Sequence, residues 1–169
     1  MPLIAVVAGI MGVGAAVFVH SVFFGAPFLP ARTRYIQQSL DMLGLQPGQH
    51  LLELGSGDGR VLVAAARRGI YSTGYEINPI LYIYSWLRTW RYRKYVTLVR
   101  GNYWLGTLPS ADGIYVFLLQ PYMRRLDDKL SREVTVPTKL LSFAFYVPGK
   151  KPIATAEGIY MYQYLPRKS

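Results

Sequence analysis

The chain contains the stretch Glu53-Leu54-Gly55-Ser56-Gly57-Asp58-Gly59-Arg60, in which three glycines alternate with polar residues. The apolar run before the glycines, His50–Leu54, predicts a short buried strand, and Arg60–Arg68 predicts a helix ended by Gly69. Glycine adopts backbone angles that other residues avoid, and it lets a ligand approach the main chain. A helix presents unpaired backbone N–H groups at its start. Strand, glycine loop and helix in this order therefore predict a ligand-binding turn.

Strands and helices alternate along the rest of the chain. Ile36, Leu40 and Leu43 recur at helical spacing, with Gly44 placed to cap the helix. The pattern after the loop predicts helices at Pro79–Tyr92 and about Met123–Arg132, and strands at Ile70–Glu76, Tyr95–Arg100, Gly113–Leu118, Lys139–Tyr146 and Ile159–Tyr164. This alternation implies an α/β fold, a doubly wound and mostly parallel sheet with helices on both faces.

The composition is that of one apolar and basic domain. Of 169 residues, 51% are hydrophobic and 17% are charged, which excludes a disordered, solvating chain. Lys and Arg number 19 against 9 acidic residues, so the net charge is +10. The chain has no cysteine, which excludes a disulfide scaffold, a thiolate nucleophile and a Cys-ligated metal, and we predict no metal site.

The N-terminal segment predicts a membrane anchor. Residues Leu3–Phe24 carry no Asp, Glu, Lys or Arg, and 22 residues make a helix of about 33 Å, enough to cross a hydrocarbon core of ~30 Å. A cleaved signal peptide is the alternative, but no cation precedes the run. We expect an anchor over residues 1–25 and one domain over 26–169. The first charge is Arg32, so the positive-inside rule predicts a single-pass protein whose domain faces the cytoplasm.

Two kinds of nucleotide ligand compete for the glycine loop. A dinucleotide site prefers G-x-G-x-x-G, whereas the third glycine here comes one residue early. Asp58 is expected to place a negative charge at the loop tip, which repels an anion and tolerates a cationic ligand. A Gly-Lys-Ser/Thr phosphate loop is absent from the sequence, so phosphoryl transfer is not favoured.

Glu76 follows the loop by about 20 residues, at the end of the second predicted strand. A carboxylate at that position can accept hydrogen bonds from both hydroxyls of a ribose. The alternative is that Glu76 only caps the helix that begins at Pro79.

These motifs resemble those of the class I, seven-strand S-adenosylmethionine-dependent methyltransferases. The segment Glu53–Gly59 resembles their first motif, Glu76 their acidic residue after strand two, and Arg100–Trp104 the segment after strand three. Glu53 and Asn102 each stand where Asp is commoner in that family. The resemblance implies S-adenosylmethionine as cofactor, bound by Pro30, Glu53, Gly55, Ser56, Gly57, Asp58, Gly59, Glu76, Asn78, Asn102, Tyr103 and Trp104.

A narrower resemblance is to the membrane-anchored lysine methyltransferases of mitochondria, which act on the ATP synthase c subunit and on the adenine nucleotide translocase. It rests on Pro27–Pro30, Leu54–Arg60, Gly74–Pro79, Asn102–Trp104 and Glu157–Ile159. It implies an N-methyltransferase that acts on a lysine of a membrane-embedded protein. Two other acceptors within this enzyme class remain open, a lipid-soluble small molecule and an RNA base.

The segment Gln120-Pro121-Tyr122 follows the fourth predicted strand and partly resembles the Asn/Asp-Pro-Pro-Tyr motif of amino methyltransferases. The resemblance implies that Gln120 and Tyr122 contact the methyl acceptor as catalytic residues. Otherwise Pro121 simply starts the next helix. Aromatic walls for the acceptor are expected from Tyr103, Trp104, Tyr122 and Tyr146, or these side chains belong to the core.

A cationic run, Arg88, Arg91, Arg93 and Lys94, interleaves with Trp86, Trp90 and Tyr92. It predicts a basic face that contacts anionic lipid, or else a solvated helix face. Nucleic acid is a further possibility that we do not expect. A non-catalytic module, which keeps the fold and holds lipid or RNA, is the competing class of function.

Overall fold

The computed structural model describes Gly12 and residues 32–166. The predicted anchor over residues 1–25 lies outside the described residues, apart from Gly12. Within the described part, no helix is long and apolar enough to cross a membrane.

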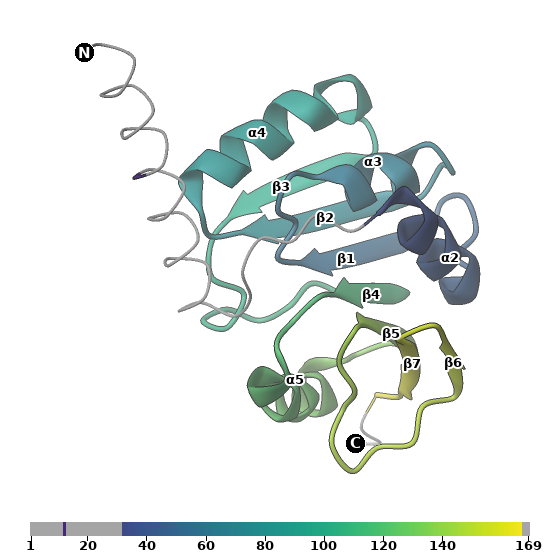
Figure 1. Ribbon diagram of the computed structural model, residues 1–169. Helices are drawn as coiled ribbons and strands as arrows, with labels where there is room; N and C mark the ends of the chain where they lie inside the picture. The colour runs from purple at the N-terminus through teal and green to yellow at the C-terminus, as the bar shows by residue number, and fades with distance from the viewer. Residues whose placement is uncertain (1–11, 13–31, 167–169) are drawn as a thin grey trace.

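The described residues form a seven-stranded sheet in the order β3-β2-β1-β4-β5-β7-β6 (Figure 1). Strands β1 to β5 run parallel, while β7 runs antiparallel to both β5 and β6. The strands are β1 His50–Leu54, β2 Tyr71–Glu76, β3 Val96–Arg100, β4 Gly113–Val116, β5 Thr138–Phe143, β6 Ala154–Ala156 and β7 Ile159–Tyr164. The predicted mostly parallel α/β sheet is confirmed.

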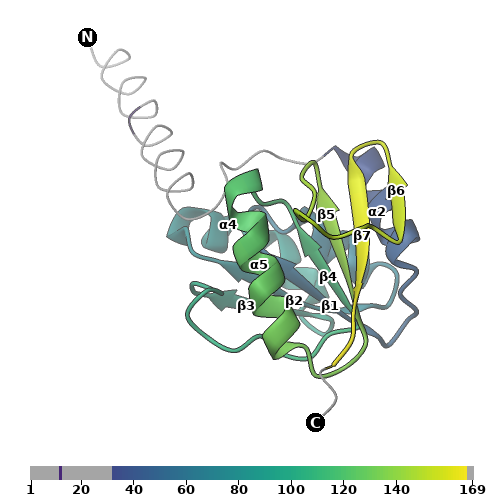
Figure 2. The same ribbon diagram turned by 90° about the horizontal axis from the view of Figure 1, so that it is seen from below.

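Helices cover both faces of this sheet. Figures 1 and 2 show α2, α3 and α4 on one face and α5 on the other. Their bounds are α2 Thr33–Leu43, α3 Arg60–Ala66, α4 Pro79–Thr89, the short 3-10 helix η1 Trp90–Tyr92, and α5 Gln120–Glu133. Because each helix between parallel strands runs back across the sheet, the loops that leave β1, β2, β3 and β4 gather at one edge, the carboxyl edge.

The core has two layers because β1 is buried on both faces. Leu51 packs with Ile36 and Leu40 of α2, while Leu52 faces the other way, into the cluster that holds Leu126 of α5. Leu51 and Leu52 are both 0% exposed. A strand buried on both faces has a nearly continuous apolar sequence. In His50–Leu54 the three leucines follow this rule, and His50 and Glu53 depart from it.

Element boundaries differ from the prediction in a few places. Gly44 caps α2 as predicted, with φ 61° and its N–H bound to the Leu40 carbonyl. Helix α3 ends at Ala66 rather than Arg68, and α5 begins at Gln120 rather than Met123. Strand β6 was not predicted, because its three residues, Ala-Thr-Ala, are too few to make a recognisable strand pattern.

Candidate active site

The glycine loop joins β1 to α3 at the carboxyl edge of the sheet. Gly55, Gly57 and Gly59 have φ of 89°, 52° and 76°, the left-handed region that only glycine enters freely. The backbone N–H groups of Gly55 and Ser56 donate to the Tyr75 carbonyl at 3.0 and 2.8 Å. A Cβ at Gly55 would meet no atom within 4 Å, so this side of the loop is open to a ligand.

Gly74 of β2 lets the loop lie directly on the sheet. A Cβ at Gly74 would lie 2.6 Å from Cδ1 of Leu62 and 2.9 Å from Cβ of Ser56. Gly74 appears in the motif that carries the resemblance, but we did not predict it as a site residue. Its function is to give the loop room, which no local pattern around Gly74 indicates.

Glu76 fixes the loop through its carboxylate. Its Oε2 accepts from Gly57 N at 2.8 Å and its Oε1 from Asn78 N at 2.8 Å, and the residue is 7% exposed. The cap of α4 is Asn78, whose Oδ1 accepts from the N–H groups of Ile80 and Leu81. The interpretation of Glu76 as the helix cap is therefore wrong. Asn78, predicted to bind the cofactor, has a structural role at the start of α4.

Glu53 is a buried acid at the end of β1. It is 4% exposed, and its Oε2 has no hydrogen-bond partner among the described residues. Burial raises the pKa of Glu53 well above its usual value, and the nearby charges of Asp58 and Glu76 raise it further. An unpartnered carboxylate oxygen beside two other acids is a place where a cationic donor is stabilised. Ser56, beside it, also has a buried hydroxyl without a partner in the described chain.

Asp58 does not present a negative charge to a ligand. Its carboxylate binds Arg60 at 2.6 Å and Arg88 of α4 at 2.8 Å, and its side chain is 5% exposed. The expected charge at the loop tip is therefore neutralised by two guanidinium groups, and the expectation of a repelled anion is corrected. The structure places Asp58 as a clamp between the loop and α4.

The segment after β3 brings aromatic side chains to the same edge. Gly101 N donates to the Glu76 carbonyl at 3.1 Å, and Asn102 Oδ1 accepts from Trp104 N at 3.0 Å. The rings of Tyr103 and Trp104 have centroids 4.8 Å apart. Tyr103 is 8% exposed, and burial raises the pKa of its hydroxyl, so it stays protonated.

Trp104 extends this aromatic wall to α5. The Trp104 and Tyr122 centroids lie 6.5 Å apart, and the Arg125 guanidinium lies over the Trp104 ring at 4.3 Å. Tyr146, a further expected wall residue, is exposed and packs edge-on against Tyr160 instead. Arg125 was not predicted from the sequence, where its one signal is its position, one helical turn after Tyr122.

Gln120 is the first residue of α5, and Pro121 follows in the first turn, as the alternative interpretation expects. The side-chain Nε2 of Gln120 donates to the Tyr146 carbonyl at 3.0 Å. This bond ties the β4–α5 junction to the segment after β5. Gln120 and Tyr122 thus lie at the carboxyl edge, while Pro30 lies outside the described residues.

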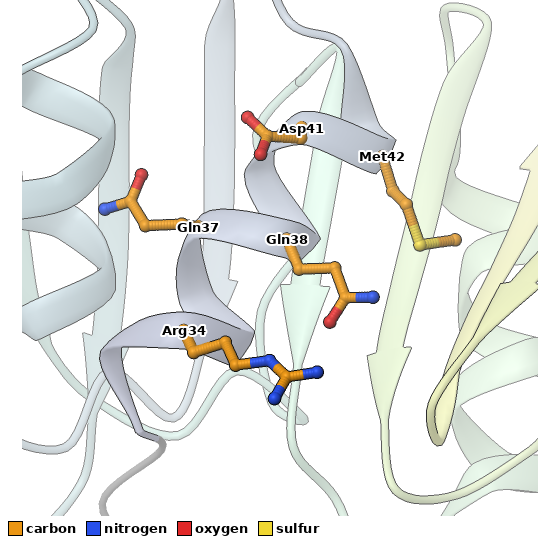
Figure 3. A pocket seen from close by; sticks show the side chains of 5 residues that line it. All are labelled: Arg34, Gln37, Gln38, Asp41 and Met42. Carbon is orange, nitrogen blue, oxygen red and sulfur yellow. The ribbon is translucent and has the colours of Figure 1, made fainter.

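A separate pocket lies on the outward side of α2 (Figure 3), lined by Arg34, Gln37, Gln38, Asp41 and Met42. Gln37 and Asp41 both accept hydrogen bonds from Arg68, two residues after the end of α3, and Arg34 binds Glu157 at 2.9 Å. Among its described lining residues there is no predicted site residue. These contacts hold α2 to its neighbours.

The fold and the site can be compared with known proteins. The family model of the ANTKMT methyltransferase domain matches residues 53–154, which is more than half of the chain. The crystal structure of an RNA methyltransferase from Salinibacter ruber, in complex with S-adenosyl-L-homocysteine, superposes with a TM-score of 0.75 over 83% of this chain and 96% of that one. At 22% identity this similarity concerns the fold, which is that of class I methyltransferases.

Two curated relatives are similar in sequence. The human lysine N-methyltransferase of the ATP synthase c subunit is 35% identical over 136 residues, or 79% of this chain. The mouse adenine nucleotide translocase lysine N-methyltransferase is 34% identical over 131 residues, or 76% of this chain. The chain spans 58% and 57% of the length of these relatives. From the matched family model, the chain belongs to the ANTKMT methyltransferase domain family.

Proposed function

We propose that this chain is an S-adenosylmethionine-dependent protein-lysine N-methyltransferase that acts on a membrane-associated protein. The observation that carries the proposal is Glu53, whose buried Oε2 lies unpartnered in the described chain beside the glycine loop. Family membership and the names of the two relatives support the same reaction.

The residues at the carboxyl edge fit this cofactor. We expect Glu76, which is held by Gly57 N and Asn78 N, to accept from the ribose hydroxyls as well. Glu53 fits the ammonium group of the methionine part, because a cation at Oε2 supplies the missing donor. Asn102 and Trp104 are the residues that would meet the adenine. When bound, S-adenosylmethionine supplies an electrophilic methyl group on a sulfonium centre.

The chain's own contribution to methyl transfer is alignment and desolvation. An amine attacks through a neutral lone pair, and an apolar aromatic surrounding lowers a lysine pKa. Trp104 and Tyr122, whose ring centroids lie 6.5 Å apart, would supply such a surrounding. Holding the amine in line supplies much of the rate gain without a strong base. Gln120 and Tyr122 remain our predictions for the residues that contact the acceptor.

Membrane association is the second part of the proposal. Leu3–Phe24 is long and apolar enough for a single span, and seven residues, 25–31, separate it from Arg32. The cations that follow it favour a domain on the cytoplasmic side. Arg34, the second residue of α2, binds Glu157 just before β7, and β7 begins beside Phe143 at the carboxyl end of β5, so the start of α2 lies near the carboxyl edge. A short link from the bilayer would thus lead to the active-site edge.

The test has a binding step and a transfer step. Calorimetry on the full chain is expected to show heat with S-adenosylmethionine and S-adenosylhomocysteine and none with NAD; the reverse result would overturn the cofactor. Incubation of membranes with methyl-labelled cofactor is then expected to label a protein band, and Glu76→Gln to abolish that label. Label in lipid or RNA would overturn the protein acceptor, and binding without transfer would indicate the non-catalytic module.

A further inference from the structure

Helix α4 turns its large apolar side chains outward. Within the described chain, six exposed large hydrophobic side chains lie on α4 and at the start of η1: Ile80, Ile83, Tyr84, Trp86, Leu87 and Trp90, each between 44% and 61% exposed. At 100° per residue these positions fall on one side of the helix. In Figure 1, α4 is the outermost layer above β2 and β3.

The inward side of α4 is small and polar. Ser85 and Thr89 are 0% and 4% exposed, and a Cβ at Gly59 would lie 2.4 Å from Ser85 Oγ. Small side chains are thus needed where α4 approaches the glycine loop. The usual arrangement of a surface helix is apolar inward and polar outward. The inversion in α4 indicates an outer surface that is itself covered by something apolar.

Aromatic rings and cations continue this surface past the end of α4. The Trp86 and Trp90 rings meet edge-on with centroids 4.7 Å apart, and the Arg93 guanidinium lies 5.0 Å above the Trp90 ring. Arg91 and Lys94 are also exposed. Arg88, which we grouped with these cations, is engaged by Asp58 instead. Tryptophan beside Arg and Lys, next to aliphatic side chains, is the composition of helices that lie in a membrane interface.

The geometry points to α4 and η1 as a docking surface that lies in the headgroup region of an anionic membrane. This inference deepens the proposed function and rests on its membrane association. The seven residues between the apolar segment and Arg32 span at most about 25 Å, so a domain on that tether stays against the bilayer. Helix α4 begins three residues after Glu76, so docking along α4 also brings the carboxyl edge close to the surface.

Charge favours lipid over the other occupants of this surface. A second copy would bring together two chains of net charge +10, each with Arg91, Arg93 and Lys94 on this surface, and their like charges would repel. RNA would gain little from the centre of the surface, because Ile83 and Leu87 offer its phosphates no donor. An anionic bilayer fits both the aliphatic and the cationic part of this surface, because its acyl region accepts the aliphatic side chains and its headgroups attract the cations.

The chain's three tryptophans provide the measurement, because Trp86 and Trp90 lie on the docking surface and Trp104 lies in the active site. The full chain is reconstituted into vesicles of three parts phosphatidylcholine to one part phosphatidylglycerol, with brominated acyl chains as the quencher. The Trp104→Phe variant, which keeps both surface tryptophans, is expected to be quenched and shifted to the blue. The Trp86→Phe/Trp90→Phe variant, which reports Trp104, is expected to be quenched much less. Equal quenching of the two variants would overturn the proposal.

Two double substitutions to glutamate distinguish docking of α4 on the membrane from anchoring by the N-terminal segment. In the Trp104→Phe background, Ile83→Glu with Leu87→Glu is expected to abolish the quenching. Ile153→Glu with Leu165→Glu, at side chains of closely similar exposure elsewhere, is expected to leave it unchanged. Retention of the chain after alkaline extraction reports on the N-terminal segment alone. Retention without quenching would overturn docking and leave anchoring intact. Emission that is shifted to the blue but not quenched would mean that protein, and not lipid, covers α4. The covering protein would be a second copy or the chain's own apolar segment, and docking on the membrane would be overturned.

Discussion

Arg88 of α4 donates to Asp58 of the glycine loop, with Nη1 2.8 Å from Oδ2 across 30 residues of chain. The same carboxylate binds Arg60 at the start of α3, so one buried acid joins the loop to two helices. Gly57, the residue before Asp58, donates to Glu76 of β2. The loop is therefore held by α4 through Asp58 and by the sheet through Gly57.

We therefore expect Arg88→Met to lower stability and weaken cofactor binding. The variant removes a charge-assisted hydrogen bond to a buried carboxylate while Arg60 remains, at a cost of about 1–2 kcal/mol, discounted because Arg88 is one-third exposed. That corresponds to a fall in Tm of roughly 3–6 °C for a chain of this size. Thermal melts and calorimetry measure both effects. Arg91→Met, at an exposed cation nearby, is the control and is expected to leave both values unchanged; equal effects of the two variants would contradict the clamp.

Glu76→Gln tests the carboxylate that holds the loop. An amide has one acceptor oxygen, so either Gly57 N or Asn78 N loses its partner. We expect S-adenosylmethionine affinity to fall by at least about tenfold, equivalent to ~1.4 kcal/mol. Titration calorimetry gives the affinity, and Asp41→Asn on the surface of α2 is the matched control. Affinity that is retained in Glu76→Gln would remove this residue from the site.

The buried Glu53 predicts two opposite effects of pH. As pH rises, the stability of the free protein is expected to fall and its affinity for the cofactor to rise. Its pKa is raised in the folded chain, so the folded state holds a proton that the unfolded state releases, and stability falls as pH rises above the usual carboxyl range. Glu53→Gln removes this loss, so its Tm is expected to exceed that of the parent chain by an amount that grows from pH 5 to pH 8.

The same substitution is expected to weaken cofactor binding, because the amide carries no charge for the ammonium group. In the parent chain, binding a cation at Glu53 releases a proton, so affinity is expected to rise with pH over that range. Melts and calorimetry at matched pH values test both signs. If the Tm of Glu53→Gln lies below that of the parent chain at pH 8, Glu53 has a hydrogen-bond or charge partner in the free protein, and the prediction is wrong.

Gly74→Ala tests the contact between the loop and β2. The added methyl group would overlap Leu62 and Ser56, and overpacking of this kind costs about 1–3 kcal/mol. We expect Tm to fall by roughly 3–9 °C, together with weaker cofactor binding. Gly106→Ala is the control, because a Cβ at Gly106 meets no atom within 4 Å. A melt of Gly74→Ala that matches the control would mean that the loop moves aside without cost.

The sequence predicts the local features of the site well because their causes are local. Three glycines between a strand and a helix require the left-handed angles that Gly55, Gly57 and Gly59 adopt. Asp58 has one partner in the same motif, Arg60, but its second partner, Arg88, lies on another helix, 30 residues away, and no spacing rule joins Arg88 to the loop. The sequence therefore did not indicate that two guanidinium groups neutralise Asp58.

The orientation of α4 was equally hidden in the sequence. Ile80, Ile83, Tyr84 and Leu87 recur at the spacing that usually marks a buried face. The structure exposes them, because the close approach of Gly59 admits only a residue as small as Ser85 on the inner side. Helical periodicity gives the two sides of a helix, and tertiary packing decides which side is buried.

Residues 1–25 are expected to serve the encounter with the acceptor and not the binding of the cofactor. Deleting them is expected to leave cofactor affinity nearly unchanged, because every residue expected to bind the cofactor, from Pro30 to Trp104, remains in the shortened chain. Methylation of the acceptor in its native membrane is expected to fall sharply, because a short tether holds the site near the bilayer at an effective concentration on the order of millimolar. Label transfer is measured on vesicles that contain the acceptor and, as the control, on the same acceptor in detergent, where both forms are expected to be equally active. Equal rates on vesicles would show that the segment serves localisation and contributes nothing to the encounter with the acceptor.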